Sequence, residues 1–280
     1  MIRILTDSTC DLTPDQRKNL GVEVIPLRVH FGDEVYRDGV DITNADFFAR
    51  LRTAEALPHT SQINPDEFVT FFRPYLEAGD EVVGIFLSSR LSGTFQSARI
   101  AADELGDPKG LHLVDSNAVT FGLGLLVAMA ARYRDAGMSA ADIAAAVAAL
   151  SPRLRLYAVV ETLKYLKMGG RISSATAVVG GMLGVTPILS VQDGVVEAAG
   201  KSRGRKGAFQ WMEKRLETEP MDPSLPMAFG HTDAPEAMAA IKDYFLPILR
   251  PRDVLEGPIG AVIGTHAGPG ATGFAYFVKE

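Results

Sequence analysis

Two hydroxyl-rich segments of this 280-residue chain have the residue types that hold a carboxylate or a phosphate. The first is "TSQ" at residues 60–62, where Thr60 and Ser61 offer two hydroxyls beside an amide. Helix capping explains part of this segment, because the "NPDE" that follows fits a helix start. Two hydroxyls and an amide are more donors than one cap uses, so the segment also fits an anion site.

The second segment is "LSSRLSGT" at residues 87–94, between an apolar run and a predicted helix. It contains Ser89, Ser92 and Thr94. The start of a helix offers free N–H groups and the positive end of the helix dipole, and both favour an anion. The lysine of a nucleotide P-loop does not follow, which argues against nucleotide binding. Capping of the helix by Ser92 alone is the simpler alternative.

His266 lies in a third segment, the glycine-rich "GTHAGPGATG" at residues 264–273. Glycine lets backbone N–H groups approach an anion closely, and the imidazole could orient its head group. A structural or solvated histidine is the plainer interpretation. A serine hydrolase would pair His266 with Ser92 or Ser89, but neither serine stands in the G-x-S-x-G pattern of a nucleophile elbow. A phosphosugar enzyme that uses "SGT" and "GPGATG" is a further alternative.

Two basic clusters could contact a phosphate or an acidic partner. "LKYLKMGGRI" places Arg171 after a pair of glycines, and "GKSRGRKGAF" contains Arg203 and Arg205 before a predicted helix. Each cluster also has a plainer interpretation, the first as cations near a helix C-terminus and the second as a solvated charged loop. The other four histidines have no metal-ligand spacing with His266, so we expect no metal site.

Composition excludes several classes of protein. The net charge of −6 argues against a nucleic-acid surface, and 47% hydrophobic residues can supply a large core. The single cysteine, Cys10, cannot form an internal disulfide, which suits a reducing cytoplasm. The N-terminus reaches polar residues too early for a secretory signal. The uncharged stretch 172–192 contains glycines and hydroxyl residues, so we interpret it as protein interior and expect no integral membrane segment.

The elements that would position these residues follow from hydrophobic periodicity. The runs "RILTDST", "EVVGIFLSS" and "LHLVDS" each end in polar residues, and helical patterns separate them. A parallel α/β sheet accounts for this pattern, and its ligands would lie beyond the carboxyl ends of the strands. Residues 116–131 are uncharged and predict a helix buried on all sides.

The second half of the chain has its own α/β pattern. We place a domain boundary at Ser151-Pro152, with one α/β domain over residues 1–152 and another over 153–280. Asp38-Gly39 and Asp193-Gly194 each predict the turn of a hairpin. The segment "PIGAVIGTH" predicts a strand that ends at His266.

Taken together, the segments resemble the DegV family of bacterial lipid-binding proteins, which includes the fatty-acid-carrying subunit of bacterial fatty acid kinase. The matching segments are "TDSTCDL" (6–12), "TSQINPDEF" (60–68), "LSSRLSGTFQSA" (87–98), "VDS" (114–116), "YLKMGGRI" (165–172), "KSRGRK" (201–206) and "GTHAGPGATG" (264–273). They cover nearly the whole chain in family order.

The resemblance implies two α/β domains with one long-chain fatty acid buried between them. Carried onto this sequence, the carboxylate ligands would be Thr60 and Ser92 with His266 nearby, and Ser61, Ser89 and Thr94 would be weaker candidates. The apolar tail would lie in a tunnel that the helix after Asp115 and the segment "VVGGMLGV" can line, with Met129 and Met182 adapting to different tails.

The resemblance further implies that a separate ATP-dependent fatty acid kinase subunit phosphorylates the bound acid. Arg171, Arg203 and Arg205 would then dock that kinase or steady an acyl phosphate. The expected protein is a cytoplasmic carrier in phospholipid metabolism, without catalytic residues, metal or cofactor, and with transient membrane contact at most. The alternative is an acyl hydrolase that uses Ser92 or Ser89 with His266.

Overall fold

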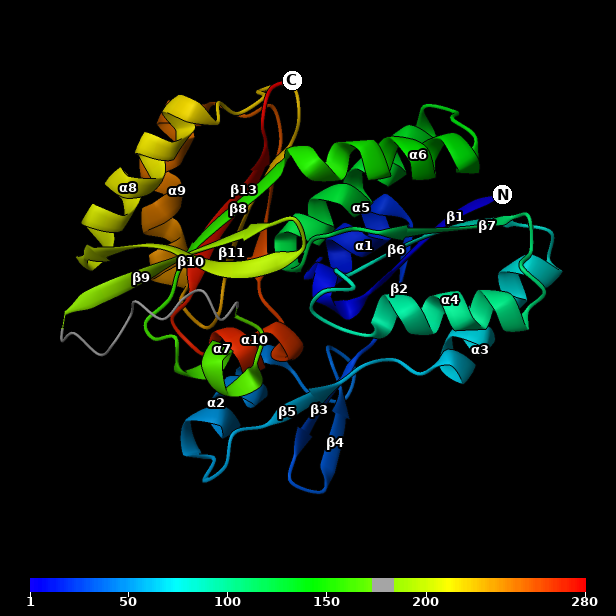
Figure 1. Ribbon diagram of the computed structural model, residues 1–280, viewed down its shortest axis with the longest axis horizontal. Helices are drawn as coiled ribbons and strands as arrows, with labels where there is room; N and C mark the ends of the chain where they lie inside the picture. Colours follow the sequence, from blue (N-terminus) through cyan, green and yellow to red (C-terminus); the bar gives the residue numbers. More distant parts are fainter. Residues whose placement is uncertain (173–183) are drawn as a thin grey trace.

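The computed structural model describes residues 1–172 and 184–280, and three sheets organise the described parts (Figure 1). The first sheet has the order β2-β1-β6-β7, and all of its strands are parallel. Its strands are β1 (Ile2–Asp7), β2 (Val22–Ile25), β6 (Glu81–Phe86) and β7 (Leu111–Asp115). The parallel α/β sheet predicted from the three polar-tipped runs is therefore confirmed.

The helices of the first half surround this sheet. They are α1 (Pro14–Leu20), α3 (Pro65–Glu77), α4 (Thr94–Glu104), α5 (Thr120–Asp135) and α6 (Ala140–Leu150), with a 3₁₀ turn at Ser8–Cys10. The predicted start of α3 is confirmed, because Asn64 and Glu67 form a reciprocal capping box in front of Pro65.

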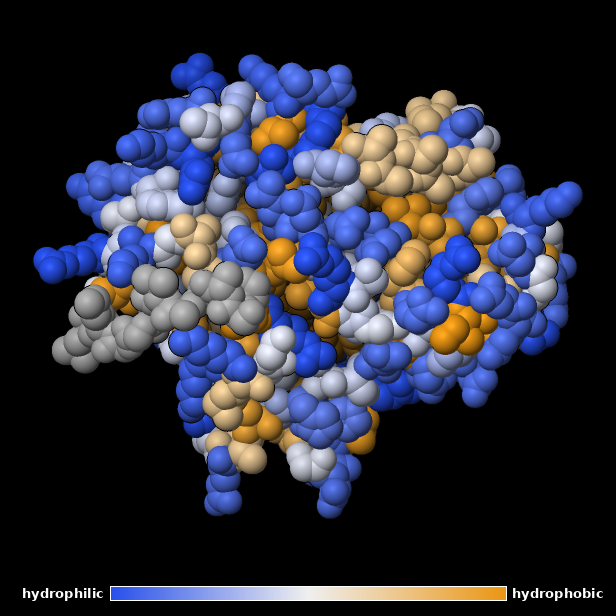
Figure 2. Space-filling model, viewed as in Figure 1, coloured by the Kyte–Doolittle hydropathy of each residue, from blue (hydrophilic) through white to orange (hydrophobic). Residues whose placement is uncertain are grey.

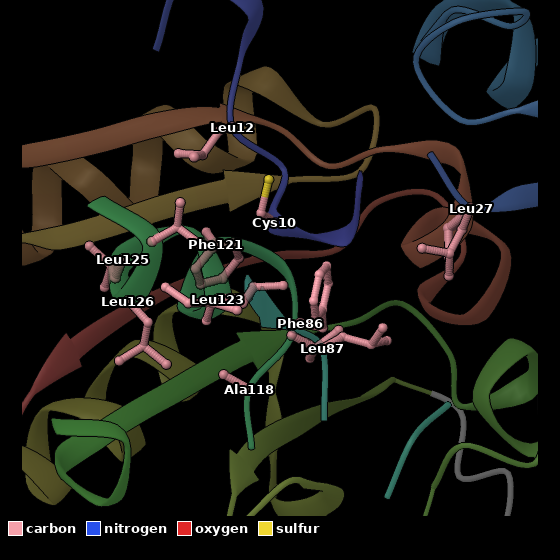
Figure 3. Close-up of a cluster of buried hydrophobic side chains, with 14 of the residues drawn as sticks. Cys10, Leu12, Leu27, Phe86, Leu87, Ala118, Phe121, Leu123, Leu125 and Leu126 are labelled. Carbon is pink, nitrogen blue, oxygen red and sulfur yellow. The ribbon is translucent and has the colours of Figure 1, made fainter. Parts of the chain in front are cut away.

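The helix predicted to be buried on all sides is α5. It packs against β1 and β6 of the first sheet and against β8, β11 and β13 of another, so it lies between the two large sheets (Figure 1). Figure 3 shows Phe121 and Leu123 of α5 in one cluster with Cys10 and Leu12, which follow β1. A helix with apolar residues all round has no face for water, and this position between two sheets supplies the burial.

The second large sheet has the order β10-β9-β8-β13-β11-β12. Its strands are β8 (Leu154–Val159), β9 (Val185–Gln192), β10 (Val195–Arg203), β11 (Met227–His231), β12 (Val254–Pro258) and β13 (Thr272–Phe277). Only the β11–β12 pair is parallel. A 3₁₀ turn at Ser151–Arg153 precedes this sheet, and the predicted domain boundary at residue 152 stays a prediction.

The helices α8 (Gly204–Thr218) and α9 (Pro235–Leu249) pack on the second large sheet and on each other. A second hydrophobic cluster fills this interface, and Phe229, Phe245 and Phe274 are fully buried in it. The hairpin predicted at Asp193-Gly194 is confirmed between β9 and β10. Both turn residues have positive φ, as a two-residue type I′ turn requires.

A small antiparallel sheet lies beside both large ones, with the order β4-β3-β5. It contains β3 (Arg28–Phe31), β4 (Glu34–Arg37) and β5 (His59–Ser61), and the short helices α2 (Asn44–Thr53), α7 (Lys164–Gly169) and α10 (Ala261–Ala267) lie close by (Figure 1). The predicted hairpin turn at Asp38-Gly39 is wrong. The strands β3 and β4 turn at Gly32 and Asp33, and Asp38 is instead buried.

The predicted strand over "PIGAVIGTH" is also wrong. The strand β12 ends at Pro258, and residues 261–267 form α10, which places His266 in the last turn of a helix. The physical reason is distant capping. Asp11 accepts a hydrogen bond from the N–H of Gly260, and Asp38 accepts one from the N–H of Ala261. Side chains far away in the sequence thus satisfy free N–H groups that a local capping residue usually satisfies.

Candidate functional site

A cavity of about 390 Å³ lies between the second large sheet, the small sheet and the start of α5. Its size falls in the range of roughly 300–1,000 Å³ that ligand pockets occupy. Most of its lining side chains are aliphatic or aromatic, and examples are Leu87, Phe121, Leu156, Val191 and Ile259. In Figure 2, apolar side chains show at the centre of the face, where the two halves of the molecule meet.

Polar groups gather at one end of the cavity. Thr60 comes from β5 and His266 from α10, and the Thr60 hydroxyl and His266 Nε2 are 2.9 Å apart. Ser61, Ser92 and Arg171 line the same cavity. Residues that are 206 positions apart in the sequence therefore build a polar end on a mainly apolar hollow, which Thr120 and Thr272 also line.

The imidazole of His266 is held neutral. Burial lowers its pKa to about 4, and the positive charge of Arg171 acts in the same direction. Its Nε2 faces Thr60, whereas Nδ1 is buried and has no hydrogen-bond partner among the described residues. Gly169 of α7 lies directly against Nδ1, since a β-carbon at this position would be 2.3 Å from it. A neutral imidazole can donate to or accept from the ligand and Thr60, depending on its tautomer.

The N-cap residue of α4 is Gly93, and Ser92 precedes it. Ser92 is therefore not the N-cap residue that the simpler alternative expected. The hydroxyl of Ser92 lies 3.0 Å from the hydroxyl of Thr94 and accepts a bond of 3.3 Å from the Thr94 N–H. Thr94 itself is fully buried and is not among the residues that line the cavity. The pair places one hydroxyl, that of Ser92, on the cavity wall.

The other candidates from the sequence lie elsewhere. Ser89 is exposed, and its N–H donates to Asp115. Arg203 and Arg205 are exposed where β10 leads into α8, and neither lines the cavity. Met182 and most of "VVGGMLGV" lie outside the described residues. The structure therefore brings together Thr60, Ser61, Ser92, Arg171 and His266, and it separates Ser89, Arg203 and Arg205 from them.

The arrangement does not form the pair that the hydrolase alternative needs, because the hydrogen bond of His266 goes to Thr60. One G-x-S-x-G sequence does occur, at residues 200–204, where β10 meets α8. The hydroxyl of its Ser202 donates to the carbonyl of Gly204, and Ser202 is not on the cavity wall.

Three aspartates, at positions 7, 11 and 38, support this site in a way that the sequence did not reveal. Asp11 and Asp38 hold the start of α10 through the N–H groups of Gly260 and Ala261, and burial raises the pKa of both carboxyl groups. Asp7 accepts bonds from Thr9 and from the N–H of Leu87, at the start of the segment that carries Ser92. Burial raises the pKa of Asp7 to about 6. The polar tip of "RILTDST" signalled Asp7 alone, and no pattern signalled the roles of Asp11 and Asp38.

A further residue that the sequence did not reveal is His30 of β3. Its Nε2 lies 2.8 Å from the hydroxyl of Ser61, and its ring stacks on His59 with the ring centres 4.5 Å apart. Ser61 therefore has a titratable partner behind the cavity wall. Burial and the neighbouring His59 lower the pKa of His30. The cross-strand pairing of His30 with His59 depends on the register of β3 and β5, and no local sequence pattern predicts that register.

In residues 1–172 and 184–280, the side chains of histidine, cysteine and acidic residues do not form a cluster of three that could hold a metal ion. Among the helices of these same ranges, none is long and apolar enough to cross a membrane. The site thus rests on hydroxyls, an imidazole and a guanidinium.

Known proteins share the sequence pattern and the architecture of this chain. Residues 1–279 match the family described as "Uncharacterised protein, DegV family". A DegV domain-containing protein of Deinococcus radiodurans is 39% identical over 275 residues, which cover 98% of this chain and 97% of the relative.

Two solved structures are similar over almost their whole length. A DegV family protein from Thermus thermophilus, described with fatty acid binding, has a TM-score of 0.92 and 36% identity, with 99% of each chain covered. DegV from Bacillus subtilis, described as a fatty acid binding protein, has a TM-score of 0.85 and 31% identity, again with 99% of each chain covered. This chain belongs to the DegV family.

Proposed function

We propose that this protein binds a long-chain fatty acid in the cavity and presents its carboxylate to a partner kinase for phosphorylation. The observation that carries the proposal is a mainly apolar hollow with a polar cluster built around Thr60 and His266. The DegV proteins from Thermus thermophilus and Bacillus subtilis bind fatty acids, which supports the same ligand class here.

The free energy of binding would come from the tail. Burial of apolar surface is worth about 0.8 kcal/mol per methylene, so a long tail offers several kcal/mol. The carboxylate loses its hydration on entry and needs hydrogen bonds in return. Thr60 and Ser92 can each donate one. A neutral His266 that donates its Nε2–H to Thr60 leaves the Thr60 proton free for the carboxylate, without burying a second charge. Arg171 adds a positive charge on the same cavity.

The location of Arg171 also supports presentation to a partner. This residue is exposed and lines the cavity, and its guanidinium donates to the carbonyls of Leu91 and Gly169. It therefore connects the polar end to the surface. Arg203 and Arg205 are exposed cations that would meet an acidic or phosphate-bearing partner. In this proposal an ATP-dependent kinase subunit performs the chemistry, and the present chain acts as the carrier in the cytoplasm, without a cofactor.

Extraction of the purified protein under denaturing conditions, followed by mass spectrometry, tests the ligand. We expect close to one long-chain fatty acid per chain. Repeated absence of fatty acid, together with no uptake of added fatty acid, would refute the proposal.

Replacement of the two hydroxyls tests the head-group site. Thr60→Val with Ser92→Ala removes two donors to a charged group, each worth about 1.5–3 kcal/mol, so the affinity for fatty acid should fall by more than about tenfold. The matched control is Thr53→Val, an exposed position at the end of α2. Equal affinities of the double variant and the control would place the carboxylate elsewhere.

The role of the arginines is tested separately. Arg203→Glu with Arg205→Glu should leave fatty acid binding unchanged, because neither residue lines the cavity, and should lower the rate at which a fatty acid kinase subunit phosphorylates the bound acid. An unchanged rate at limiting kinase concentration would remove these two residues from the docking surface.

A further inference from the structure

The cavity has a second end, and the register of the second large sheet shows where it lies. On β8 the lining residues alternate, so that Leu156, Ala158 and the following Val160 point to the cavity. The chain continues from Val160 into α7, whose Gly169 lies against His266. The Val160 side is therefore the polar end, and Leu156 marks the opposite end. About four residues of extended chain separate them, which corresponds to about 13 Å.

A row of three side chains crosses the sheet at this far end. Leu156 of β8 pairs with Val191 of β9, and Val191 pairs with Val196 of β10. All three residues are buried and line the cavity. The next row toward the polar end contains Ala158 and Leu189, which pair with each other. Paired residues on neighbouring strands have side chains that lie next to each other on the same face of the sheet. The three side chains of the row at the far end therefore form a continuous aliphatic wall.

This wall is thin. Val191 also lines a separate hollow of about 180 Å³, whose other walls include the polar residues Arg90, Asn117, Gln192 and Asp193. A methyl end of a ligand would gain nothing by entering a polar hollow, because its apolar surface would stay in contact with water and polar groups. The side chain of Val191 thus separates the apolar cavity from a polar one.

The wall is also fixed in place. The tip of the β9–β10 hairpin is held by the segment after β6: Ser88 donates to the carbonyl of Gly194 at 2.8 Å, and Arg90 donates to the carbonyl of Asp193 at 3.0 Å. Gly194 has positive φ, and a β-carbon there would be 2.4 Å from the Ser88 hydroxyl. The hairpin therefore cannot retreat from the cavity without breaking contacts with the other half of the molecule.

From these observations we infer that Val191 and Val196 end the acyl pocket and set the length of the tail that the protein binds best. This inference rests on the proposed fatty acid function and names the two residues that select its substrate by length. Ser88 and Arg90 are positioning residues, since they act on the ligand only through the hairpin.

The test measures dissociation constants for straight-chain saturated fatty acids that differ by two methylenes, with ligand-free protein. The affinity of the wild-type protein should rise about fourfold per methylene up to an optimum length and then stop rising. Val196→Phe adds about four carbon atoms to the wall, so its optimum should move to chains shorter by about two to four methylenes. Val191→Ala removes two carbon atoms from the wall. The space that they leave inside the apolar cavity should move the optimum toward chains longer by up to about two methylenes.

Val35→Phe is the matched control, because it makes the same change on the exposed surface of β4. Should Val196→Phe fail to fold, Val191→Ala decides the question by itself. Opposite shifts in the two variants support the inference. A wild-type protein with a clear optimum that neither variant moves would overturn it while leaving fatty acid binding intact. A wild-type protein that binds no fatty acid of any length would instead refute the proposed function.

Discussion

Protonation of His266 should cost this protein stability in a defined range of pH. Burial lowers the pKa of the imidazole to about 4, against an ordinary value of about 6.5. Between these values the unfolded chain binds a proton at His266 and the folded chain does not. The stability that the neutral imidazole contributes is therefore fully present above about pH 6.5, and it is lost as the pH falls toward about 4.

The magnitude follows from the two pKa values. By proton linkage, the folded protein at about pH 4.5 should have lost about 2.5 kcal/mol relative to neutral pH through this one residue. His266→Gln keeps a side chain that can bond to Thr60 and removes the titration. The free energy of unfolding of the wild-type protein should therefore fall by about 2.5 kcal/mol more than that of the variant between about pH 7 and about pH 4.5.

The comparison with the variant is necessary because Asp7 acts in the opposite direction. Its pKa is raised to about 6, so the folded protein gains stability from Asp7 as the pH falls through about 6, over part of the same range. Asp7 is present in both proteins, so its contribution cancels in the difference between them. The wild-type protein alone could show a flat profile although both groups titrate.

Urea unfolding of ligand-free protein at several pH values, followed by circular dichroism, provides the measurement. Parallel profiles for the wild-type protein and His266→Gln would show that the imidazole takes up its proton in the folded state as easily as in water, which would refute the reasoning. With a fatty acid bound, a carboxylate next to His266 would favour the imidazolium form, and the difference between the two profiles should shrink.

Three further predictions concern the support of the site and of the second core. Asp38→Ala leaves the buried N–H of Ala261 without its acceptor and should lower the free energy of unfolding in urea by about 1–3 kcal/mol. It should also weaken fatty acid binding. Unchanged affinity would show that the start of α10 does not position the head-group site. Gly169→Ala places a β-carbon against the ring of His266 and should lower fatty acid affinity at least severalfold by isothermal titration, and unchanged affinity would contradict the geometry. Phe274→Ala opens a cavity in the second core and should cost about 3–5 kcal/mol of unfolding free energy, and a loss below about 1 kcal/mol would contradict its burial.

The parts of the fold that follow from local rules could be predicted from the sequence. The parallel strands β1, β6 and β7 are apolar runs with polar ends, and α5 is a helix whose uncharged first turns have to be buried. The turn at Asp193-Gly194 was predictable because both residues accept positive φ. In each case the determining residues are neighbours in the sequence.

The start of α10 was not predictable in the same way. Its free N–H groups bond to Asp11 and Asp38, which are 249 and 223 residues away from the donors. Locally, "AVIG" is a β-branched run that favours a strand. Asp38 was misinterpreted for a related reason. The chain does turn at Asp38-Gly39, since the N–H of Val40 donates to the carbonyl of Arg37, but the turn joins no hairpin and this aspartate is buried as an acceptor. Local propensity fails here because tertiary hydrogen bonds decide the structure.

The site shows the same dependence on contacts between distant segments, and this has a consequence for binding. At the polar end Thr60 of the small sheet meets His266, and at the far end Ser88 and Arg90 hold the tip of the β9–β10 hairpin. Both ends of the cavity are thus closed by contacts between the first and second halves of the chain. A ligand that fills the cavity binds only when both sets of contacts are made, so its binding free energy adds to the stability of this arrangement. At a free concentration about a hundred times the dissociation constant, that addition is about 2.7 kcal/mol, comparable with the whole effect of His266 titration.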